Sequence, residues 1–294
     1  MQINWNDDLA LRAADYSIER FKAAGIDVHG ASRLPKARAC VARSRRHPLV
    51  ELSAGGALAE RVLEAQRTIM EFFCVASVLK GPQDPLAGLI PLALKGADLA
   101  RDDQNSQARN HQFECFVLAL IRLSGIADVT VGEPDIRIRA GDQNIGIAAK
   151  RISSLEQRQC EKNLRKAASQ IRAQRGIGFI VLNLDAAAKD AWEARGHAAG
   201  IAAVTDVVEN AKNWLQSRRL ERGVVAVYGF ATLLGWNVAV DPAILSVDMT
   251  THAAFIVPEP EQPGVFRFVT DRAASLRQSF ARLMSQLESL PPAT

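Results

Sequence analysis

Apolar residues recur at helical spacing through most of the first hundred residues. The spacing predicts one helix from Leu9 to Gly25 and a longer one from about Ala57 to Leu79, with a broad apolar face. Gly55-Gly56 precedes the longer helix and Gly81-Pro82 follows it, and both pairs are typical of helix ends. We therefore expect residues 1–100 to form a helical N-terminal region.

The pattern changes after a polar segment at residues 96–110, which we interpret as a linker or the start of the next helix. Helical spacing then alternates with short extended runs, and Ala140 to Gln143 is typical of a hairpin turn. The predicted order is helix, three strands, helix, strand: Gln107–Leu123, Asp128–Val131, Asp135–Arg139, Asn144–Ala149, Leu155–Arg175 and Ile177–Leu184.

The remaining residues continue the α/β alternation. The predicted elements are a helix at Val204–Leu220, strands at Gly223–Phe230, Ala243–Val247, Ala253–Val257 and Val265–Val269, and a closing helix at Asp271–Leu290. The expected fold class is therefore α/β, with a helical region at 1–100 and an α/β domain at 101–294.

The composition and charge of the chain are typical of a soluble globular protein. The chain is 48% hydrophobic and 23% charged, which excludes collagen-like and wholly disordered chains. No apolar run approaches the ~20 residues of a membrane helix, and the acidic, polar N-terminus is unlike a secretory signal, so we expect a cytoplasmic protein. The four cysteines form no CxxC pair, and the net charge of +4 is compatible with nucleic-acid binding.

Alternation along the predicted hairpin brings an acid and a lysine together. Asp135, Arg137 and Arg139 share one face of the first strand. Antiparallel pairing around the turn can then place Asp135 beside Lys150 at one end of the sheet. A carboxylate and an ammonium group in this position, behind a helix that carries Glu114, form a plausible site for Mg²⁺ and water.

These residues resemble the PD-(D/E)XK nuclease family, whose restriction-endonuclease-like core has the order helix, three strands, helix, strand. The resemblance covers residues 107–185. The matching residues are Gln112-Phe113-Glu114, Glu133-Pro134-Asp135-Ile136, Ile147 to Arg151, and Asn163, Lys166 and Gln170 on the following helix.

The resemblance implies a metal-dependent nuclease that hydrolyses DNA. By this resemblance, Asp135 would hold Mg²⁺ or Mn²⁺, and Glu114 would be a supporting acid from the first helix. Lys150 would orient or activate the attacking water, and Gln170 matches a glutamine that some members place on the helix after the lysine strand. On the alternative interpretation, Glu114 is a helix-surface residue, Asp135 is a turn residue at the start of a strand, and Lys150 is a solvated strand end.

The family pattern has Asp or Glu two residues before the lysine, where this chain has Ala148. Alanine cannot bind a cation, so three explanations remain open. The acid has moved elsewhere, with Glu133 and Glu114 as candidates; the domain has lost catalysis and kept binding; or Ala148 is an engineered substitution for Glu.

Basic residues are concentrated in and after the lysine strand. Between Lys150 and Arg175 there are eight basic and two acidic residues. Such a surface suits the phosphate backbone of a nucleic acid, although a solvated helix surface is the alternative. The candidate nucleic-acid-binding residues are Arg151, Arg158, Lys162, Arg165 and Lys166.

A second basic segment, Arg33 to Arg46, has six basic residues and no acidic one. It is interpreted as a solvated loop or helix face, or as an arm that contacts phosphates.

Three functions therefore stay open at this stage: a metal-dependent DNA nuclease, an inactive relative that binds nucleic acid or a protein, and an interaction protein whose helical N-terminal region docks a partner. The chain contains no P-loop, GxGxxG, GxSxG or HExxH motif, so the sequence offers no nucleotide-binding loop, nucleophile elbow or zincin site as a competing interpretation.

Overall fold

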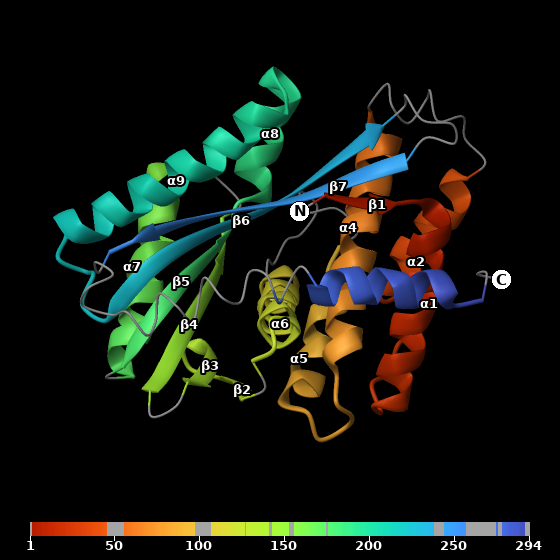
Figure 1. The fold of residues 1–294 in the computed structure, drawn as a ribbon, viewed down its shortest axis with the longest axis horizontal. Helices are drawn as coiled ribbons and strands as arrows, with labels where there is room; N and C mark the ends of the chain where they lie inside the picture. Colours follow the sequence, from red (N-terminus) through yellow and green to blue (C-terminus); the bar gives the residue numbers. More distant parts are fainter. Residues whose placement is uncertain are drawn as a thin grey trace. The chain divides into compact units, whose positions relative to one another are not determined.

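The computed structural model describes residues 2–45, 56–97, 107–126, 128–140, 143–152, 156–174, 176–237, 244–256, 275 and 278–291. A run of helices is followed by strands and helices that form a mixed sheet unit (Figure 1), so the predicted α/β class is confirmed. The chain divides into two compact units. The sheet unit contains Gly125–Leu233 and Met249–Ser275, and the helical unit contains Gln2–Ser124, Leu234–Asp248 and Leu276–Thr294.

The helical unit is built around one long central helix, α4. Its labelled helices are α1 (Asp7–Ala23), α2 (Arg33–Ser44), α4 (Ala57–Val78), α5 (Pro85–Ala93) and α6 (Gln107–Leu123). Helix α4 packs against α1, α2 and α6, and α5 packs against α6. Phe21 and Phe72 are fully buried between α1 and α4, with ring centroids 5.9 Å apart. The two long helices predicted near residues 9–25 and 57–79 are thus confirmed.

Side-chain caps begin two helices of this unit. The Asn6 side chain accepts a hydrogen bond from the Leu9 N–H (2.8 Å) ahead of α1, and Asp84 accepts one from the Leu86 N–H (3.1 Å) ahead of α5. Asp84 also accepts two hydrogen bonds from the Arg122 guanidinium of α6, at 2.6 and 2.9 Å. The start of α5 is therefore fixed to α6.

Both ends of the chain contribute to the helical unit. Strand β1 (Gln2–Trp5) pairs antiparallel with the Leu245–Asp248 part of β7 (Ile244–Phe255). The closing helix is described at residues 278–289, within the range predicted for it. It is anchored to α1, because Arg12 donates hydrogen bonds to two of the last carbonyl oxygens of the described chain, those of Glu288 and Leu290 at 3.1 and 2.7 Å.

The sheet unit holds most of the strands. Its elements are β2 (Val129–Gly132), β3 (Asp135–Ala140), β4 (Gln143–Arg151), α7 (Gln157–Ala173), β5 (Ile177–Asn183), α8 (Asp185–Arg195), α9 (His197–Ser217), β6 (Val224–Asn237) and β7, the last two having residues in both units. The strand order is β1-β7-β6-β5-β4-β3-β2. Strands β2, β3 and β4 pair antiparallel, whereas β4, β5 and β6 run parallel. Residues 107–183 therefore have the order helix, three strands, helix, strand.

Helices α7 and α9 contribute the apolar side chains of one core in the sheet unit. On α7, a stripe at helical spacing is buried: Leu164, Ala167, Ala168 and Ile171. These side chains cluster with Ala148 of β4, Ile180 of β5 and Val208 of α9. The stripe leaves the opposite side of α7 to its polar and basic residues.

The basic segment at Arg33–Arg46 forms helix α2, apart from its last residues. Arg33 is 2% exposed, and Arg38 forms an ion pair with Asp15 of α1 at 2.5 Å. Within the described residues, the side chains of Arg33 and Arg38 therefore contribute to packing between helices.

Some expectations fall outside the described residues. They are the tip of the predicted hairpin turn at 141–142, most of the predicted linker with the domain boundary near residue 100 (98–106), and the predicted strand at Val265–Val269. Among the helices that the structure does describe, none is long and apolar enough to cross a membrane.

Candidate functional site

The β3–β4 pair brings Asp135 and Lys150 together. Asp135 is the first residue of β3, and Lys150 is the last but one of β4. Because Ile136 is paired with Ile147, the carboxylate of Asp135 lies over the last residues of β4. The Lys150 Nζ atom is 2.6 Å from Oδ2 of Asp135, so the predicted proximity of the two side chains is confirmed.

Two further donors fix the Asp135 carboxylate. The Ala149 N–H donates to Oδ2 at 2.9 Å, and the Gln170 amide of α7 donates to Oδ1 at 3.3 Å. Lys150 also donates to the carbonyl oxygen of Ala149 at 3.0 Å, which holds its ammonium group against the strand. The structure thus brings together Asp135, Lys150 and Gln170, three of the four predicted catalytic residues.

Gly146 on β4 leaves room for the ring of Pro134, the residue before Asp135. A Cβ atom on Gly146 would lie only 2.7 Å from Cγ of Pro134, so a larger residue at 146 would displace the proline ring. Asp135 itself has a φ of 128°, a backbone conformation that residues other than glycine rarely adopt. Such conformations persist where the surrounding contacts hold them, and they often occur at functional sites.

Burial shapes the electrostatics of the pair. The side chains of Asp135 and Lys150 are only 13% and 11% exposed. Burial raises the pKa of Asp135 above its ordinary value, because a carboxylate loses hydration there, while the Lys150 ammonium and the hydrogen bonds from Ala149 and Gln170 lower it in part. The carboxylate therefore takes up a proton more readily than an exposed aspartate.

Ala148 lies in the core rather than at an open site. It is 0% exposed and packs in the apolar cluster with side chains of α7 and β5, including Leu164, Ala168 and Ile180. The position that carries an acid in the resembled family is thus closed off by packing in this chain. Any second carboxylate for a cation has to come from another position.

The donor set determines how a cation could be held. The family resemblance implies Mg²⁺, which prefers oxygen ligands and usually keeps several waters, with one or two protein carboxylates. In the described part of the chain, no three His, Cys, Asp or Glu side chains are grouped so as to hold a metal ion. The described residues around Asp135 therefore do not form a closed all-protein metal cage.

Gln170 offers an acceptor beside Asp135. Its Oε1 atom is buried and has no hydrogen-bond partner among the described residues, while its amide nitrogen donates to Asp135. A buried acceptor without a partner marks a place for a water molecule or a ligand donor. This atom supports a polar, hydrated site next to the carboxylate.

Glu114 belongs to the helical unit, so only its own surroundings are described. It lies on α6, 17% exposed, with a carboxylate oxygen 3.1 Å from Nδ1 of His111. Gln112, on the same helix, is buried and donates to Glu71 of α4 at 2.5 Å. Glu133, the other candidate for a relocated acid, is exposed in the turn before β3.

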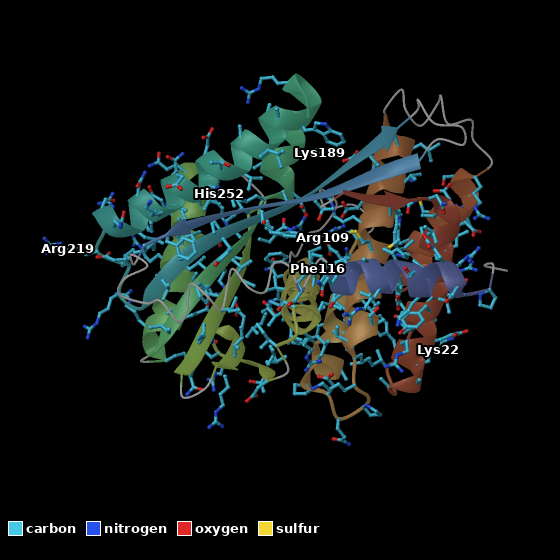
Figure 2. The ribbon with its side chains drawn as sticks, in the orientation of Figure 1. Lys22, Arg109, Phe116, Lys189, Arg219 and His252 are labelled. Carbon is cyan, nitrogen blue, oxygen red and sulfur yellow. The ribbon has the colours of Figure 1, made fainter. Side chains whose placement is uncertain are left out.

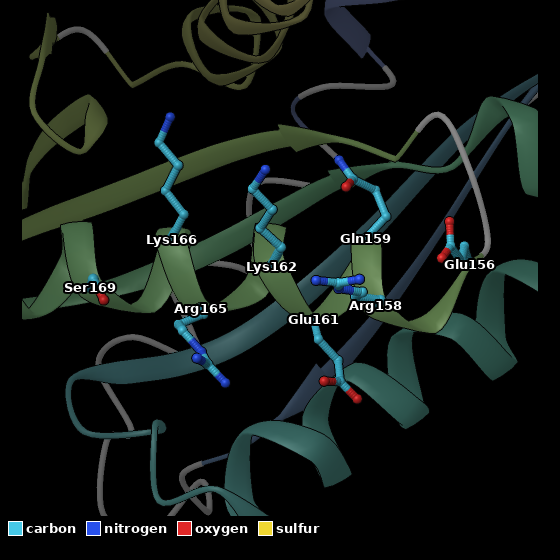
Figure 3. Close-up of a pocket in the computed structure, with 8 residues that line it drawn as sticks. All are labelled: Glu156, Arg158, Gln159, Glu161, Lys162, Arg165, Lys166 and Ser169. Atoms are coloured by element: carbon cyan, nitrogen blue, oxygen red, sulfur yellow. The ribbon is translucent and has the colours of Figure 1, made fainter.

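The predicted nucleic-acid-binding residues follow α7. Arg158, Lys162, Arg165 and Lys166 are all exposed, whereas Arg151 at the end of β4 is half-buried. The four helix residues, with Glu156, Gln159, Glu161 and Ser169, line an open depression of about 810 Å³. Figure 3 shows these side chains on and beside α7. In the described part of the chain, none of these four basic side chains forms a salt bridge.

Sequence reasoning missed a second polar cluster, at the end of β5 and beside the middle of β6. Asp185 is 6% exposed and accepts hydrogen bonds from the Asn183 amide (2.8 Å) and from the Thr232 N–H (2.7 Å). Because Asn183 pairs with Arg151, this cluster lies one strand away from Lys150. The Asn-Leu-Asp run after an apolar strand was the available signal, since polar residues at the carboxyl ends of parallel strands commonly border ligand sites.

Figure 2 shows the side chains of both units, among them His252 of β7, whose Nε2 lies 3.2 Å from a Glu209 carboxylate oxygen on α9. This contact lies on the surface of the sheet unit and adds no group to the site.

Comparison of this chain with protein-family models, with curated proteins and with solved structures finds no match.

Proposed function

We propose that this chain is a metal-dependent nuclease that hydrolyses DNA phosphodiester bonds. The observation that carries the proposal is the Asp135–Lys150 pair, 2.6 Å apart and partly buried, beside a helix that bears five basic residues and one acidic residue. The element order at residues 107–183 and the position of the pair at the ends of β3 and β4 further support a restriction-endonuclease-like core.

Each residue has a distinct role in the proposal. Asp135 would hold Mg²⁺ or Mn²⁺. When bound, the ion would supply a Lewis acid for the phosphate group. The Lys150 ammonium orients the attacking water or offsets negative charge on the phosphate, and the Ala149 carbonyl holds that ammonium in place. Gln170 positions Asp135 through Nε2 and can accept a hydrogen bond from water at Oε1.

A second candidate function is DNA binding without cleavage. Ala148 favours it, because the chain lacks a carboxylate at that position and the site is packed with apolar side chains. In this candidate the Asp135–Lys150 pair serves only to join β3 to β4. A protein-binding role for the helical N-terminal region is a third candidate. No contact among the described residues favours it over the other two.

A cleavage time course distinguishes these functions. Linear, nicked and supercoiled DNA would be incubated with Mg²⁺ or Mn²⁺, using the wild-type chain, Lys150→Ala, Glu114→Gln and a control with EDTA. We expect cutting by the wild type, loss of at least about 100-fold for Lys150→Ala and no cutting with EDTA. Lys22→Ala, which removes an exposed ammonium group from α1 in the helical unit, is the matched control and should cut normally.

Two results would overturn the proposal. If the wild type cuts no faster than Lys150→Ala, the chain does not hydrolyse DNA through this site. If EDTA leaves cutting intact, the reaction does not depend on a divalent cation. A normal rate for Glu114→Gln would contradict only the supporting role that the resemblance implies for Glu114.

A further inference from the structure

Helix α7 has two polar edges that carry different basic groups. Figure 3 shows Gln159, Lys162 and Lys166 projecting from one edge of the helix, whereas Glu161 and Arg165 project from the other. The first edge carries two ammonium groups and no acid. Helical spacing places Arg158 and Arg172 on the second edge with Arg165, so that edge combines three guanidinium groups with the acid Glu161.

We propose that a DNA strand follows the Lys162–Lys166 edge of α7 toward Asp135, and that Arg165 lies outside this path. The identity of the polymer rests on the proposed function, whereas the direction of the path rests on the geometry of α7. This inference narrows the basic surface predicted from sequence to one edge of the helix, called here the lysine edge (Gln159, Lys162 and Lys166).

The lysine edge is continuous with the candidate site. Residues 162, 166 and 170 are spaced four apart, so they lie near one another on the helix at steps of about 6 Å along its axis. Gln170 is the member that reaches Asp135, with a hydrogen bond of 3.3 Å to Oδ1. Lys166 therefore stands about 6 Å, and Lys162 about 12 Å, from the residue that contacts the site.

The chemistry of the edge suits phosphate oxygens. Both lysines are exposed and, in the described part of the chain, neither forms a hydrogen bond or salt bridge, so their ammonium groups can bind an anion without breaking an internal contact. Lysine binds phosphate as a point charge, and the Gln159 amide can add a neutral donor. The described residues that line the depression include no aromatic side chain, so the contacts expected are to the backbone and independent of base sequence.

The salt dependence of binding tests this path. Each phosphate contact contributes about 0.9 (duplex) or 0.7 (single strand) to the slope of log Kobs against log salt. Fluorescence anisotropy with labelled single-stranded and duplex DNA would be recorded in EDTA, so that binding is measured without cutting. The proteins are the wild type, Lys162→Ala, Lys166→Ala, the double variant, Arg165→Ala and the Lys22→Ala control.

We expect each lysine variant to reduce the slope by about 0.7 to 0.9 and the double variant by about twice as much. Arg165→Ala should reduce it by much less than either lysine variant, and Lys22→Ala should leave it unchanged. Equal reductions for Arg165 and the lysines would overturn the one-sided path, as would unchanged slopes for both lysine variants or no DNA binding at low salt.

The cleavage assay separates this inference from the proposed function. Binding that depends on the lysine edge, without any cutting, retains the path and removes hydrolysis. Cutting that requires Lys150 but is unaffected in the double lysine variant retains hydrolysis and removes the path. Circular dichroism melting of each variant verifies that it is folded, which these exposed positions should permit.

Discussion

Ala148 is the residue at which the candidate site departs most from the family it resembles. Its side chain is fully buried against α7, so a glutamate there would have to displace apolar neighbours and place a carboxylate among them. We predict that Ala148→Glu lowers the free energy of unfolding by roughly 3 kcal/mol instead of completing a metal site. Urea unfolding would measure the loss, with Ala173→Glu, an exposed position on α7, as the control expected within about 0.5 kcal/mol of wild type.

The same variant also tests how the acid was lost. An Ala148→Glu protein with unchanged stability and faster Mg²⁺-dependent cutting would contradict the prediction. It would also show that only this carboxylate was missing. A destabilised variant that cuts no faster supports a site whose second acid lies at another position.

The titration of Asp135 is a second prediction at this scale. Burial raises the pKa of Asp135 above the ordinary value of 3.8, so folding favours the protonated form relative to the unfolded chain. The group therefore contributes stability below the unfolded pKa, and this contribution is lost as pH rises through the folded pKa. Metal binding and cutting need the carboxylate, so we expect both to fall on acidification at a pH above 3.8.

The carboxyl carbon shift of Asp135, followed by NMR in the metal-free protein, measures this midpoint directly. In Lys150→Ala the midpoint should move higher still, because the ammonium group that lowers the pKa of Asp135 is gone. A midpoint at or below 3.8 in the folded wild type would contradict the prediction.

Much of the site was predictable from residue alternation. A period of two along each strand fixes which side chains share a face, and a hairpin fixes which strand ends meet, so Asp135 and Lys150 could be paired from sequence. The alternation cannot show which helix covers that face, and so it could not reveal that Ala148 is closed off. Nor could it show that the amide of Gln112, in the resembled motif, binds Glu71.

At the scale of elements, the link between α5 and α6 is a stability prediction. Burial raises the pKa of Asp84, but hydrogen bonds from Arg122 and from the Lys80 and Leu86 N–H groups outweigh it, so the pKa of Asp84 is lowered overall. Asp84→Ala leaves the Arg122 charge, only 7% exposed, without this partner. We expect the free energy of unfolding to fall by about 3 kcal/mol at pH 7.

The pH dependence identifies the cause of that loss. A lowered pKa means that the stabilisation is present above the unfolded pKa near 3.8 and disappears as pH falls through the folded pKa. The difference in stability between the wild type and Asp84→Ala should therefore shrink as pH falls through the folded pKa, which lies below 3.8. A difference that does not change between pH 7 and the acid range would assign the effect to packing or to the helix cap instead.

The long helices with a clear apolar stripe were predicted well, whereas the short elements β1 and α5 were not predicted. Helix α6 has the predicted bounds, and α4 and α7 differ from theirs by only one or two residues at each end. Helix α8 was missed because its alanines give little contrast along the helix. Strand β7 was expected as two strands, because its polar middle, which includes Asp248, interrupts the apolar pattern; in the sheet, Asp248 pairs with Gln2 of β1.

For the whole molecule, the path of the chain leads to a prediction about fragments. The helical unit includes Leu234–Asp248 and the closing helix as well as Gln2–Ser124. A fragment 1–124 would lose the strand that pairs with β1. Trp5, at the end of β1, is 1% exposed in the intact chain. It would also lose the carbonyl oxygens that bind Arg12, so we expect it to be largely unfolded or to melt well below the intact chain.

The complementary fragment provides the other half of the test. Fragment 125–294 keeps the strands of the sheet unit, including the hydrogen bond from Ile256 to Val225, but β7 would lack its partner β1. Mixing the two fragments should restore helical circular dichroism and protection from proteolysis, because β1 regains its pairing with β7. If fragment 1–124 alone melts cooperatively at the temperature of the intact chain, the helical unit does not depend on its later segments. The two ends of the chain would then contribute little to its stability.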